Sequence, residues 1–354
     1  LSRKNISKGK APLSVKDALT AMIKAHEIQG IIALENCFNK VGMDHVLLVR
    51  IASTAVACAL LGGSFEEVRN AVSHAFIDGG ALRTYRHAPN TGSRKSWAAG
   101  DASSRGVDLA LKALTGEMGY PSALSAKFWG YEDVKMKGQK LTIPQEFGSY
   151  VMENVLFKIS FPAEFHAQTA VEAALALHDE VKNRLDEVEK IVITTQESGH
   201  RIINKTGELA NPADRDHCIQ YMVAVPLIYG ELKAEHYEDS VAKDPRIDAL
   251  RSKMEVEVDD RYTKEYLESD KRSIANAVQI FYKDGTSSKK VEVEYPIGHR
   301  RRRSDGIPLL IEKFERNIAL KLSPKKCEQI KKICASQKEL ENMAFNDFSD
   351  LFAL

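Results

Sequence analysis

The class of this fold is decided by an apolar run that reads Val46-Leu-Leu-Val-Arg-Ile-Ala-Ser-Thr-Ala-Val-Ala-Cys-Ala-Leu-Leu-Gly62. Arg50 interrupts the run, which is shorter than the about 20 apolar residues that a bilayer span needs. It therefore predicts a buried helix in the core of a soluble protein. Asp44-His45 stand directly before it, where the polar start of a helix is expected.

Helical spacing of apolar residues continues on both sides of this run. Between residues 14 and 124, the predicted helices cover residues 15–27, 34–39, 45–61, 65–76 and 102–114. Ser64-Phe-Glu-Glu67 has the pattern of a capping box and marks the start of one of them. This part of the chain is predicted to form a helix bundle.

The pattern changes after Trp129. Short strands are predicted for 131–141 and 191–195, a long helix for 168–188, and a β-hairpin for 275–283 and 289–295 around Asp284-Gly285. We expect a mainly α protein, in which a helical-bundle domain carries an inserted, smaller α+β domain. The expected boundaries are 1–150 for the helical domain, 151–300 for the α+β lid domain and 301–354 for C-terminal helices that return to the helical domain.

Composition limits the classes of protein and of site. The 354 residues are 44% apolar, and 50 Lys and Arg nearly cancel 49 Asp and Glu. The cysteines are odd in number, scattered and without Cys-x-x-Cys spacing, which argues against disulfides and against zinc or iron–sulfur sites. They are Cys37, Cys58, Cys218, Cys327 and Cys334. No metal motif and no phosphate-binding glycine loop occurs in the sequence, so we expect no metal and no cofactor.

One segment concentrates positive charge in this neutral chain. It reads Arg83-Thr-Tyr-Arg-His-Ala-Pro-Asn-Thr-Gly-Ser-Arg-Lys-Ser-Trp97 and holds four fixed cations and a histidine. A helical pattern follows, so its last residues are expected at a helix N-terminus, where free N–H groups also favour anions. We predict a site for carboxylates or phosphates. Nucleic-acid binding is an alternative, although it favours a strongly basic domain, and a solvated loop without ligand is another.

Four further groups have the character of site residues. His45 begins the apolar helix, whose positive end would keep the imidazole neutral, as a base requires; a surface N-cap histidine is the alternative. Lys158 lies among apolar residues and needs an anion if it is buried, but a side chain that reaches water is the favoured interpretation. Asp214-Arg-Asp-His217 begins another helix, and Tyr295-Pro-Ile-Gly-His-Arg-Arg-Arg-Arg303 is interpreted as a solvated turn.

Several strings of this sequence resemble the MmgE/PrpD family. They are His26-Glu-Ile-Gln-Gly30, residues 83–105, residues 148–166, Asn211-Pro-Ala-Asp-Arg-Asp-His-Cys-Ile-Gln-Tyr221 and Tyr295-Pro-Ile-Gly-His299. The resemblance covers nearly the whole chain and is specific, because the strings are long and occur in order. It implies a helical domain with an inserted α+β lid, a homodimer, and a metal-independent enzyme that removes water from 2-methylcitrate to give 2-methylaconitate in propionate catabolism.

The resemblance also implies site residues. His45, Lys95, Lys158 and Tyr221 match the active-site His, two Lys and Tyr of a family relative that decarboxylates cis-aconitate. We assign catalysis to these positions. Substrate binding is assigned to Arg83, Arg86, His87, Arg94, His166 and His217. A tricarboxylate requires cations both for binding and for the charge that develops during proton removal, whereas His45 suits acid–base chemistry and Tyr221 suits proton donation to the departing hydroxyl.

One departure from the family concerns the start of the chain. The family has an N-terminal helical portion that carries an Asp, a Thr and a His of the active site, and we expect that portion and any targeting segment to lie upstream of Leu1. The expected compartment is the mitochondrial matrix in a eukaryote and the cytoplasm otherwise, with no nucleic-acid or membrane partner. Two alternatives remain: a cis-aconitate decarboxylase, and a non-catalytic protein that binds anions or nucleic acid.

Overall fold

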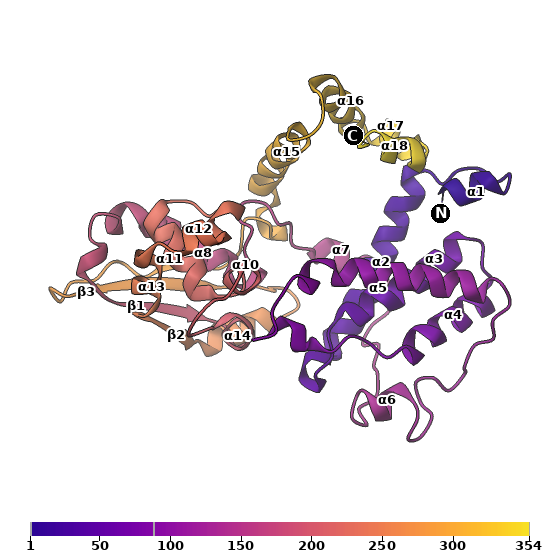
Figure 1. Ribbon diagram of the computed structural model, residues 1–354, viewed down its shortest axis with the longest axis horizontal. Helices are drawn as coiled ribbons and strands as arrows, with labels where there is room; N and C mark the ends of the chain where they lie inside the picture. The colour runs from indigo at the N-terminus through magenta and orange to yellow at the C-terminus, as the bar shows by residue number, and fades with distance from the viewer. Residues whose placement is uncertain (1, 88, 354) are drawn as a thin grey trace. The chain divides into compact units, whose positions relative to one another are not determined.

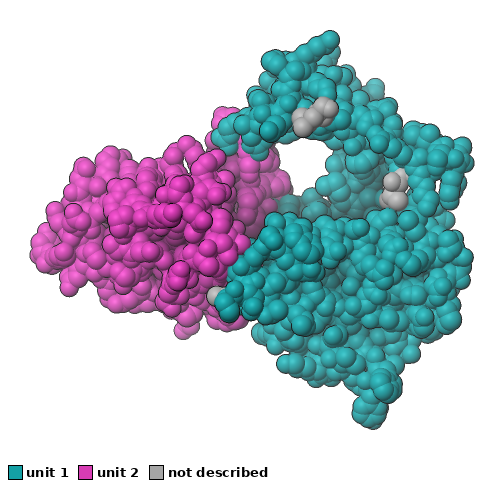
Figure 2. All heavy atoms as spheres, in the orientation of Figure 1, with its two compact units in different colours: residues 1–155, 314–354 teal, residues 156–313 magenta. Residues whose placement is uncertain are grey.

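The computed structural model describes residues 2–87 and 89–353. Contacts within the chain separate it into two units, which Figure 2 shows in different colours. Unit 1 comprises Leu1–Val155 and Phe314–Leu354, and unit 2 comprises Leu156–Lys313. Each unit has buried apolar clusters of its own.

The core of unit 1 is made by long helices. They are α2 (Val15–Glu35), α3 (Val46–Leu60), α4 (Phe65–Ile77) and α5 (Arg94–Ala113) (Figure 1). The apolar run is confirmed as the buried helix α3, whose Leu47, Ile51 and Cys58 are buried. Within the described ranges, no helix has both the length and the apolar character needed to cross a bilayer.

Shorter elements complete unit 1. They are α1 (Ser2–Ser7), η1 (Phe38–Val41), η2 (Arg83–Arg86), α6 (Tyr131–Val134), α7 (Tyr150–Asn154), α16 (Pro324–Ala335), α17 (Gln337–Asn342) and α18 (Phe345–Asp350). Helix α15 (Arg303–Ala319) begins in unit 2 and ends in unit 1. The C-terminal helices lie beside the start of α2, where Val15 N–H donates to Met343 O over 2.8 Å.

Local side-chain chemistry explains where these helices begin. The predicted capping box is confirmed, since Ser64 N–H donates to Glu67 Oε2 (2.7 Å) and Glu67 N–H donates to Ser64 Oγ (3.3 Å). Ser14 and Asp17 form the same arrangement at the start of α2. Each box satisfies two N–H groups that a helix N-terminus leaves without partners.

Three sequence predictions for unit 1 need correction. The strand at 131–141 is wrong: this segment begins with α6, and Tyr131 is buried against Phe76 with ring centroids 5.3 Å apart. Its apolar residues fill the helical core instead of pairing in a sheet. The helices predicted at 15–27 and 34–39 are mostly one helix, α2, followed by η1. Helix α5 begins at Arg94, eight residues before the predicted start at 102.

Unit 2 contains a mixed four-stranded sheet. The strands are β1 (Val188–Thr195), β2 (Met254–Val258), β3 (Asn276–Tyr282) and β4 (Val291–Val293), in the order β2-β1-β3-β4. β2 is parallel to β1, whereas β3 is antiparallel to both β1 and β4. The predicted strand at 191–195 and the β3–β4 hairpin are confirmed, and β2 was not predicted because its alternating glutamates make it a polar edge strand.

Helices cover this sheet. The main ones are α8 (Gln168–Val181), α11 (Ile219–Tyr229) and α13 (Pro245–Arg251), which form one apolar cluster with β1 and β3 (Figure 1). The others are η3 (Phe165–Ala167), η4 (Leu185–Glu187), α9 (Glu197–Ile203), α10 (Pro212–Arg215), η5 (Ala234–Tyr237), α12 (Asp239–Ala242), α14 (Asp260–Leu267) and η6 (Arg300–Arg302). The helix predicted at 168–188 ends at Val181, and the rest of that range holds η4 and the first residue of β1. The predicted fold class, mainly helical with a small α+β part, is confirmed.

One glycine sets how closely α3 and α5 approach. A Cβ on Gly106 would lie 2.9 Å from Ser53 Cβ and 3.0 Å from both Arg50 O and Thr54 N. Two of these atoms belong to the backbone of α3, so they cannot turn aside as a flexible side chain would. The absent side chain is therefore what allows the two helices to touch.

We expect Gly106→Ala to lower the free energy of unfolding by about 1–3 kcal/mol, because overpacking outweighs the better helix propensity of alanine. Gly100→Ala is the matched control in the same helix, since nothing lies within 4 Å of a Cβ there; we expect it to be neutral or stabilising by up to about 1 kcal/mol. Urea denaturation measures both. Equal stability of the two variants would contradict a close helix contact at Gly106.

Candidate active site

The first group of site residues gathers around Asp44 in unit 1. Asp44 is fully buried, its Oδ1 accepts the Val46 N–H at the start of α3 (3.0 Å), and its Oδ2 accepts Nε–H of Arg86. Burial alone would raise the pKa of Asp44, but the hydrogen bonds from Arg86 and Val46 lower it below its ordinary value. Asp44 is thus an ionised carboxylate that ties the cationic segment 83–97 to α3.

His45 is the N-cap residue of α3, as predicted. Loss of water contact lowers its pKa, and the nearby Arg86 and Arg83 act in the same direction, against the opposite effect of Asp44. Its side chain is 57% exposed, so solvent limits the size of this shift. The imidazole is therefore neutral at pH 7 and reachable from solvent, which suits a base.

The cationic segment is held by stacking on aromatic rings. The Arg86 guanidinium lies 5.0 Å from the centroid of the Tyr85 ring, and that of Arg94 lies 4.4 Å from the centroid of Trp97. Arg83 donates to Asn39 Oδ1 (3.1 Å). Contacts of this kind fix the positions of cations that would otherwise repel one another. Several cations of the segment therefore have partners within the protein.

The end of the cationic segment forms the first turn of α5, in agreement with the prediction. Arg94 and the half-buried Lys95 open this 20-residue helix, and His87 is exposed on the preceding loop. The helix N-terminus adds its partial positive charge to those of the side chains. Two cationic side chains and a helix N-terminus thus lie together at this end of α5.

A cavity of about 270 Å³ lies beside Arg94 in unit 1. Its charged lining residues are Arg50, Asp78, Arg94, Asp101 and Arg105, from α3, α5 and the end of α4. Burial lowers the pKa of Arg50, whose Nε has no hydrogen-bond partner among the described residues. In the sequence Arg50 was interpreted only as an interruption of an apolar run. Its neighbours in the sequence do not reveal that it shares a cavity with Arg105 of α5.

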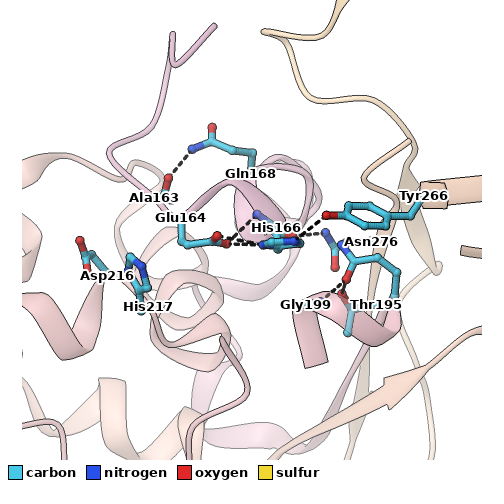
Figure 3. A network of polar contacts seen from close by, with 11 residues as sticks. Ala163, Glu164, His166, Gln168, Thr195, Gly199, Asp216, His217, Tyr266 and Asn276 are labelled. Atoms are coloured by element: carbon cyan, nitrogen blue, oxygen red, sulfur yellow. Dashed lines mark hydrogen bonds and ion pairs between the residues drawn. The ribbon is translucent and has the colours of Figure 1, made fainter. Parts of the chain in front are cut away.

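A second group of polar residues lies in unit 2, and His166 is at its centre (Figure 3). Its Nδ1 lies 2.8 and 2.9 Å from the two carboxylate oxygens of Glu164, and its Nε2 lies 3.3 Å from the Tyr266 hydroxyl. Sequence reasoning did not select Glu164, although its spacing from His166 is visible. It had no means of finding Tyr266, because 100 residues separate the two in sequence.

Lys158 and His217 lie near the same carboxylate. The Lys158 residue is exposed, as expected of a side chain that reaches water. Partial loss of water contact nevertheless lowers its pKa, against the attraction of Glu164 and Asp216, and its Nζ lies 4.8 Å from the centroid of the Phe165 ring. His217 Nδ1 lies 2.9 Å from Asp216 Oδ1. Lys158, His166 and His217, predicted separately, are thus brought together around Glu164.

Tyr221 occupies a different environment. It is 2% exposed, it stacks on Tyr237, and its hydroxyl donates to His236 O over 2.6 Å. Burial raises its pKa to about 12. The hydroxyl must leave the His236 carbonyl before it can donate a proton to a substrate.

The second cationic block is not the solvated turn that the sequence suggested. His299 is 1% exposed, and burial together with Arg300 and Arg301 lowers its pKa to about 4. Arg302 donates to Glu172 Oε2 (2.7 Å) and to Tyr295 O (2.6 Å). The block is therefore bound to α8 through Glu172. The prediction of a solvated turn was wrong because Glu172 is distant from Arg302 in sequence.

Comparisons with known proteins agree with this architecture. The model of the MmgE/PrpD N-terminal domain matches residues 5–144, and that of the MmgE/PrpD C-terminal domain matches residues 161–339. The chain belongs to the MmgE/PrpD family. Together the two domain models match most of this family member, so the helical part and the part with the sheet each have a counterpart.

Three relatives of this MmgE/PrpD protein show the extent of its sequence identity. 2-Methylcitrate dehydratase of Escherichia coli K12 is 57% identical over 357 residues, which cover 100% of this chain and 74% of the relative. The Cupriavidus necator protein of that name is 56% identical with the same coverage. The mitochondrial 2-methylcitrate dehydratase of Yarrowia lipolytica is 57% identical over 96% of this chain and 65% of its own length.

Asp44 offers a test of the site in unit 1. We expect Asp44→Asn to lower the free energy of unfolding by about 3–5 kcal/mol, because it leaves the Arg86 charge, 14% exposed, without its counter-ion. Since the folded-state pKa of Asp44 is lowered, its contribution is complete above the unfolded pKa of ~3.9 and is lost as pH falls through the folded value.

The measurement is chemical denaturation of both proteins across pH 2.5–8. The stability difference should be constant near neutrality and shrink at acid pH. A difference that stays the same down to the lowest pH would show that Asp44 does not act through its charge.

Proposed function

We propose that this chain is a 2-methylcitrate dehydratase, a hydro-lyase that eliminates water from 2-methylcitrate to give 2-methylaconitate. The observation that carries the proposal is 57% identity over the full chain to the bacterial enzyme of that name. At this identity and coverage, the same architecture and the same chemistry are expected. The distribution of cations in both units supports the same conclusion.

The reaction determines what the site residues must do. A proton next to a carboxylate is weakly acidic, and negative charge builds on that carboxylate when the proton leaves. Fixed cations stabilise this charge without reorganising, which is the largest available contribution to catalysis of this type. We assign this role to Arg94, Lys95 and Lys158, with Arg83, Arg86 and His87 binding other carboxylates of the substrate.

The proposed base is His45. Its lowered pKa keeps the imidazole in the proton-accepting form at neutral pH, and more than half of its side chain is exposed. His166 and His217 are proposed to contact the substrate in unit 2. Tyr221 remains a proposed proton donor, subject to release of its hydroxyl from the His236 carbonyl.

We also propose that the enzyme is a homodimer and works without a metal. Within residues 2–87 and 89–353, no three His, Cys, Asp or Glu side chains are grouped so that they could hold a metal ion. The Yarrowia relative is named as mitochondrial. The proposed compartment is accordingly the mitochondrial matrix in a eukaryotic source and the cytoplasm in a bacterial one.

We expect purified protein that includes any upstream segment to convert 2-methylcitrate to an unsaturated tricarboxylate in the presence of a strong chelator. Ultraviolet absorbance of the new double bond reports the reaction, and product analysis separates it from decarboxylation of cis-aconitate. Loss of activity with the chelator and its return with iron would rule out the metal-independent mechanism. Salt-sensitive retention on nucleic acid without turnover of any tricarboxylate would favour the non-catalytic alternative.

Lys95→Met and Lys158→Met test the cationic roles. Each should lower kcat/KM by an amount that corresponds to about 2–5 kcal/mol, as loss of one partner of a desolvated charge pair does. Matched controls are Lys112→Met, in the last turn of α5 and paired with Asp108, and Lys182→Met, paired with Asp179. Because these pairs are exposed, each control variant should change kcat/KM by an amount that corresponds to less than about 1 kcal/mol. Turnover by Lys95→Met close to that of Lys112→Met would remove Lys95 from the site.

A further inference from the structure

The hydrogen bonds around His166 have the geometry of a proton relay. Glu164 is the N-cap residue of η3, and its carboxylate accepts both the backbone N–H of His166 (2.7 Å) and Nδ1 (2.8 Å). The opposite nitrogen, Nε2, faces the hydroxyl of Tyr266 on α14 (Figure 3). The side chains of His166 and Glu164 are 13% and 16% exposed, so solvent competes little with these contacts.

A buried frame holds the histidine in this position. Asn276, fully buried at the start of β3, donates through Nδ2 to His166 O (2.7 Å) and to Thr169 Oγ1 (2.6 Å). Thr169 in turn donates to Ile274 O. The backbone of His166, from which the imidazole extends, is therefore held by β3 and α8 and not by its own turn alone. A relay needs such rigidity, because proton transfer depends on distances within hydrogen-bond reach.

The charge on Glu164 decides which nitrogen carries the proton. Burial would raise the pKa of Glu164, but His166 and His217 lower it below the ordinary value, so the carboxylate is ionised near neutral pH. An ionised carboxylate only accepts hydrogen bonds, and Nδ1 must therefore be protonated. Nε2 is left as the nitrogen that exchanges a proton with Tyr266.

The hydroxyl of Tyr266 has different partners from that of Tyr221. Burial and Glu164 raise its pKa, so the phenol is protonated at neutral pH, whereas Ser198, Arg272 and Arg201 act in the opposite direction and stabilise a phenolate. Its hydroxyl contacts Nε2 of His166 and is not committed to a backbone carbonyl in the way that of Tyr221 is. The side chain is only partly buried.

We propose that Glu164, His166 and Tyr266 form a proton relay that supplies the proton to the departing hydroxyl of the substrate, with Tyr266 as the catalytic acid and Glu164 as a positioning residue. The proposal rests on the proposed dehydratase function. The relay operates when His166 carries a proton on each ring nitrogen, so that Nδ1 donates to Glu164 and Nε2 donates to the Tyr266 oxygen. The hydroxyl hydrogen of Tyr266 is then free to point toward the substrate.

The step balances in protons and electrons. A base removes the proton next to the substrate carboxylate, and that electron pair becomes the carbon–carbon double bond as the carbon–oxygen bond breaks. The leaving oxygen takes the Tyr266 hydroxyl proton and departs as water. The Tyr266 oxygen takes the Nε2 proton of His166, and solvent reloads Nε2 while the base releases its own proton.

Other charged groups face this relay from several segments. They are Lys158, Arg201 on α9, Asp216, His217 and Arg272. Glu164 differs from all of them because it touches the histidine directly. Its replacement should therefore have the largest effect on the pH dependence of the reaction.

The experiment compares Tyr266→Phe, Glu164→Gln and the control Tyr262→Phe with the wild type on 2-methylcitrate between pH 5 and 9. Tyr262 lies on the same helix, but its hydroxyl donates to Glu292 (2.7 Å), away from the relay. Tyr266→Phe should lower kcat by about 10²–10⁴-fold, as loss of a general acid does, with KM changed far less. Glu164→Gln should also lower kcat and change the shape of its pH profile, because the carboxylate that accepts the Nδ1 proton is lost.

The outcomes separate this relay from the proposed function. If the wild type turns over 2-methylcitrate and Tyr266→Phe is as active as Tyr262→Phe, the relay alone is overturned. A Glu164→Gln variant whose kcat has the same pH profile as the wild type would also overturn it. A wild-type protein without activity on 2-methylcitrate would overturn the function and the relay with it. If the variants do not fold, ¹⁵N NMR of the wild-type His166 ring decides: a proton on Nδ1 is expected, and a ring whose Nδ1 carries no proton contradicts the relay.

Discussion

The buried ion pair between Asp44 and Arg86 is the interaction on which the site in unit 1 depends. A site for a tricarboxylate needs several cations close together, and cations so placed repel one another. Asp44 offsets this repulsion from within the core, and the same carboxylate accepts the Val46 N–H at the start of α3. One side chain thus joins the helix that carries His45 to the segment that carries Arg83, Arg86 and Arg94.

Unit 2 meets the same constraint with Glu164. Burial would raise the pKa of this carboxylate, but His166 and His217 lower it, so it is ionised. Lys158 lies near the same carboxylate. In both units an acidic residue acts on a histidine that follows it in sequence, one position later for Asp44 and His45 and two positions later for Glu164 and His166. The two cases differ in that His45 is largely exposed whereas His166 is held between two hydrogen-bonding partners.

Packing determines how accurately these groups can be held. In unit 1 the contact at Gly106 lets α5 approach α3, and the first turn of α5 bears Arg94 and Lys95. In unit 2, Asn276 and Thr169 connect β3 and α8 directly beneath His166. The polar side chains of the proposed site thereby lie on helices and strands, or on short turns next to them. Side-chain positions are best defined there.

Local sequence determined the elements and the residues with a local signature. The buried α3, the capping box at Ser64, the β3–β4 hairpin and the cationic segment before α5 each depend on spacing or on neighbours within a few positions, so they were predictable from the chain alone. The family was also recognisable from short strings of consecutive residues, and the matches to its two domain models confirm it.

Tertiary structure alone decided which distant residues meet. Arg302 binds Glu172 across 130 positions, Tyr266 meets His166 across 100, and Tyr131 packs in a helical core although its pattern suggested a strand. The polar strand β2 is a strand only because β1 lies beside it. The free energy of a buried contact depends on what surrounds a side chain in space, and residue spacing carries that information only where the chain is locally regular.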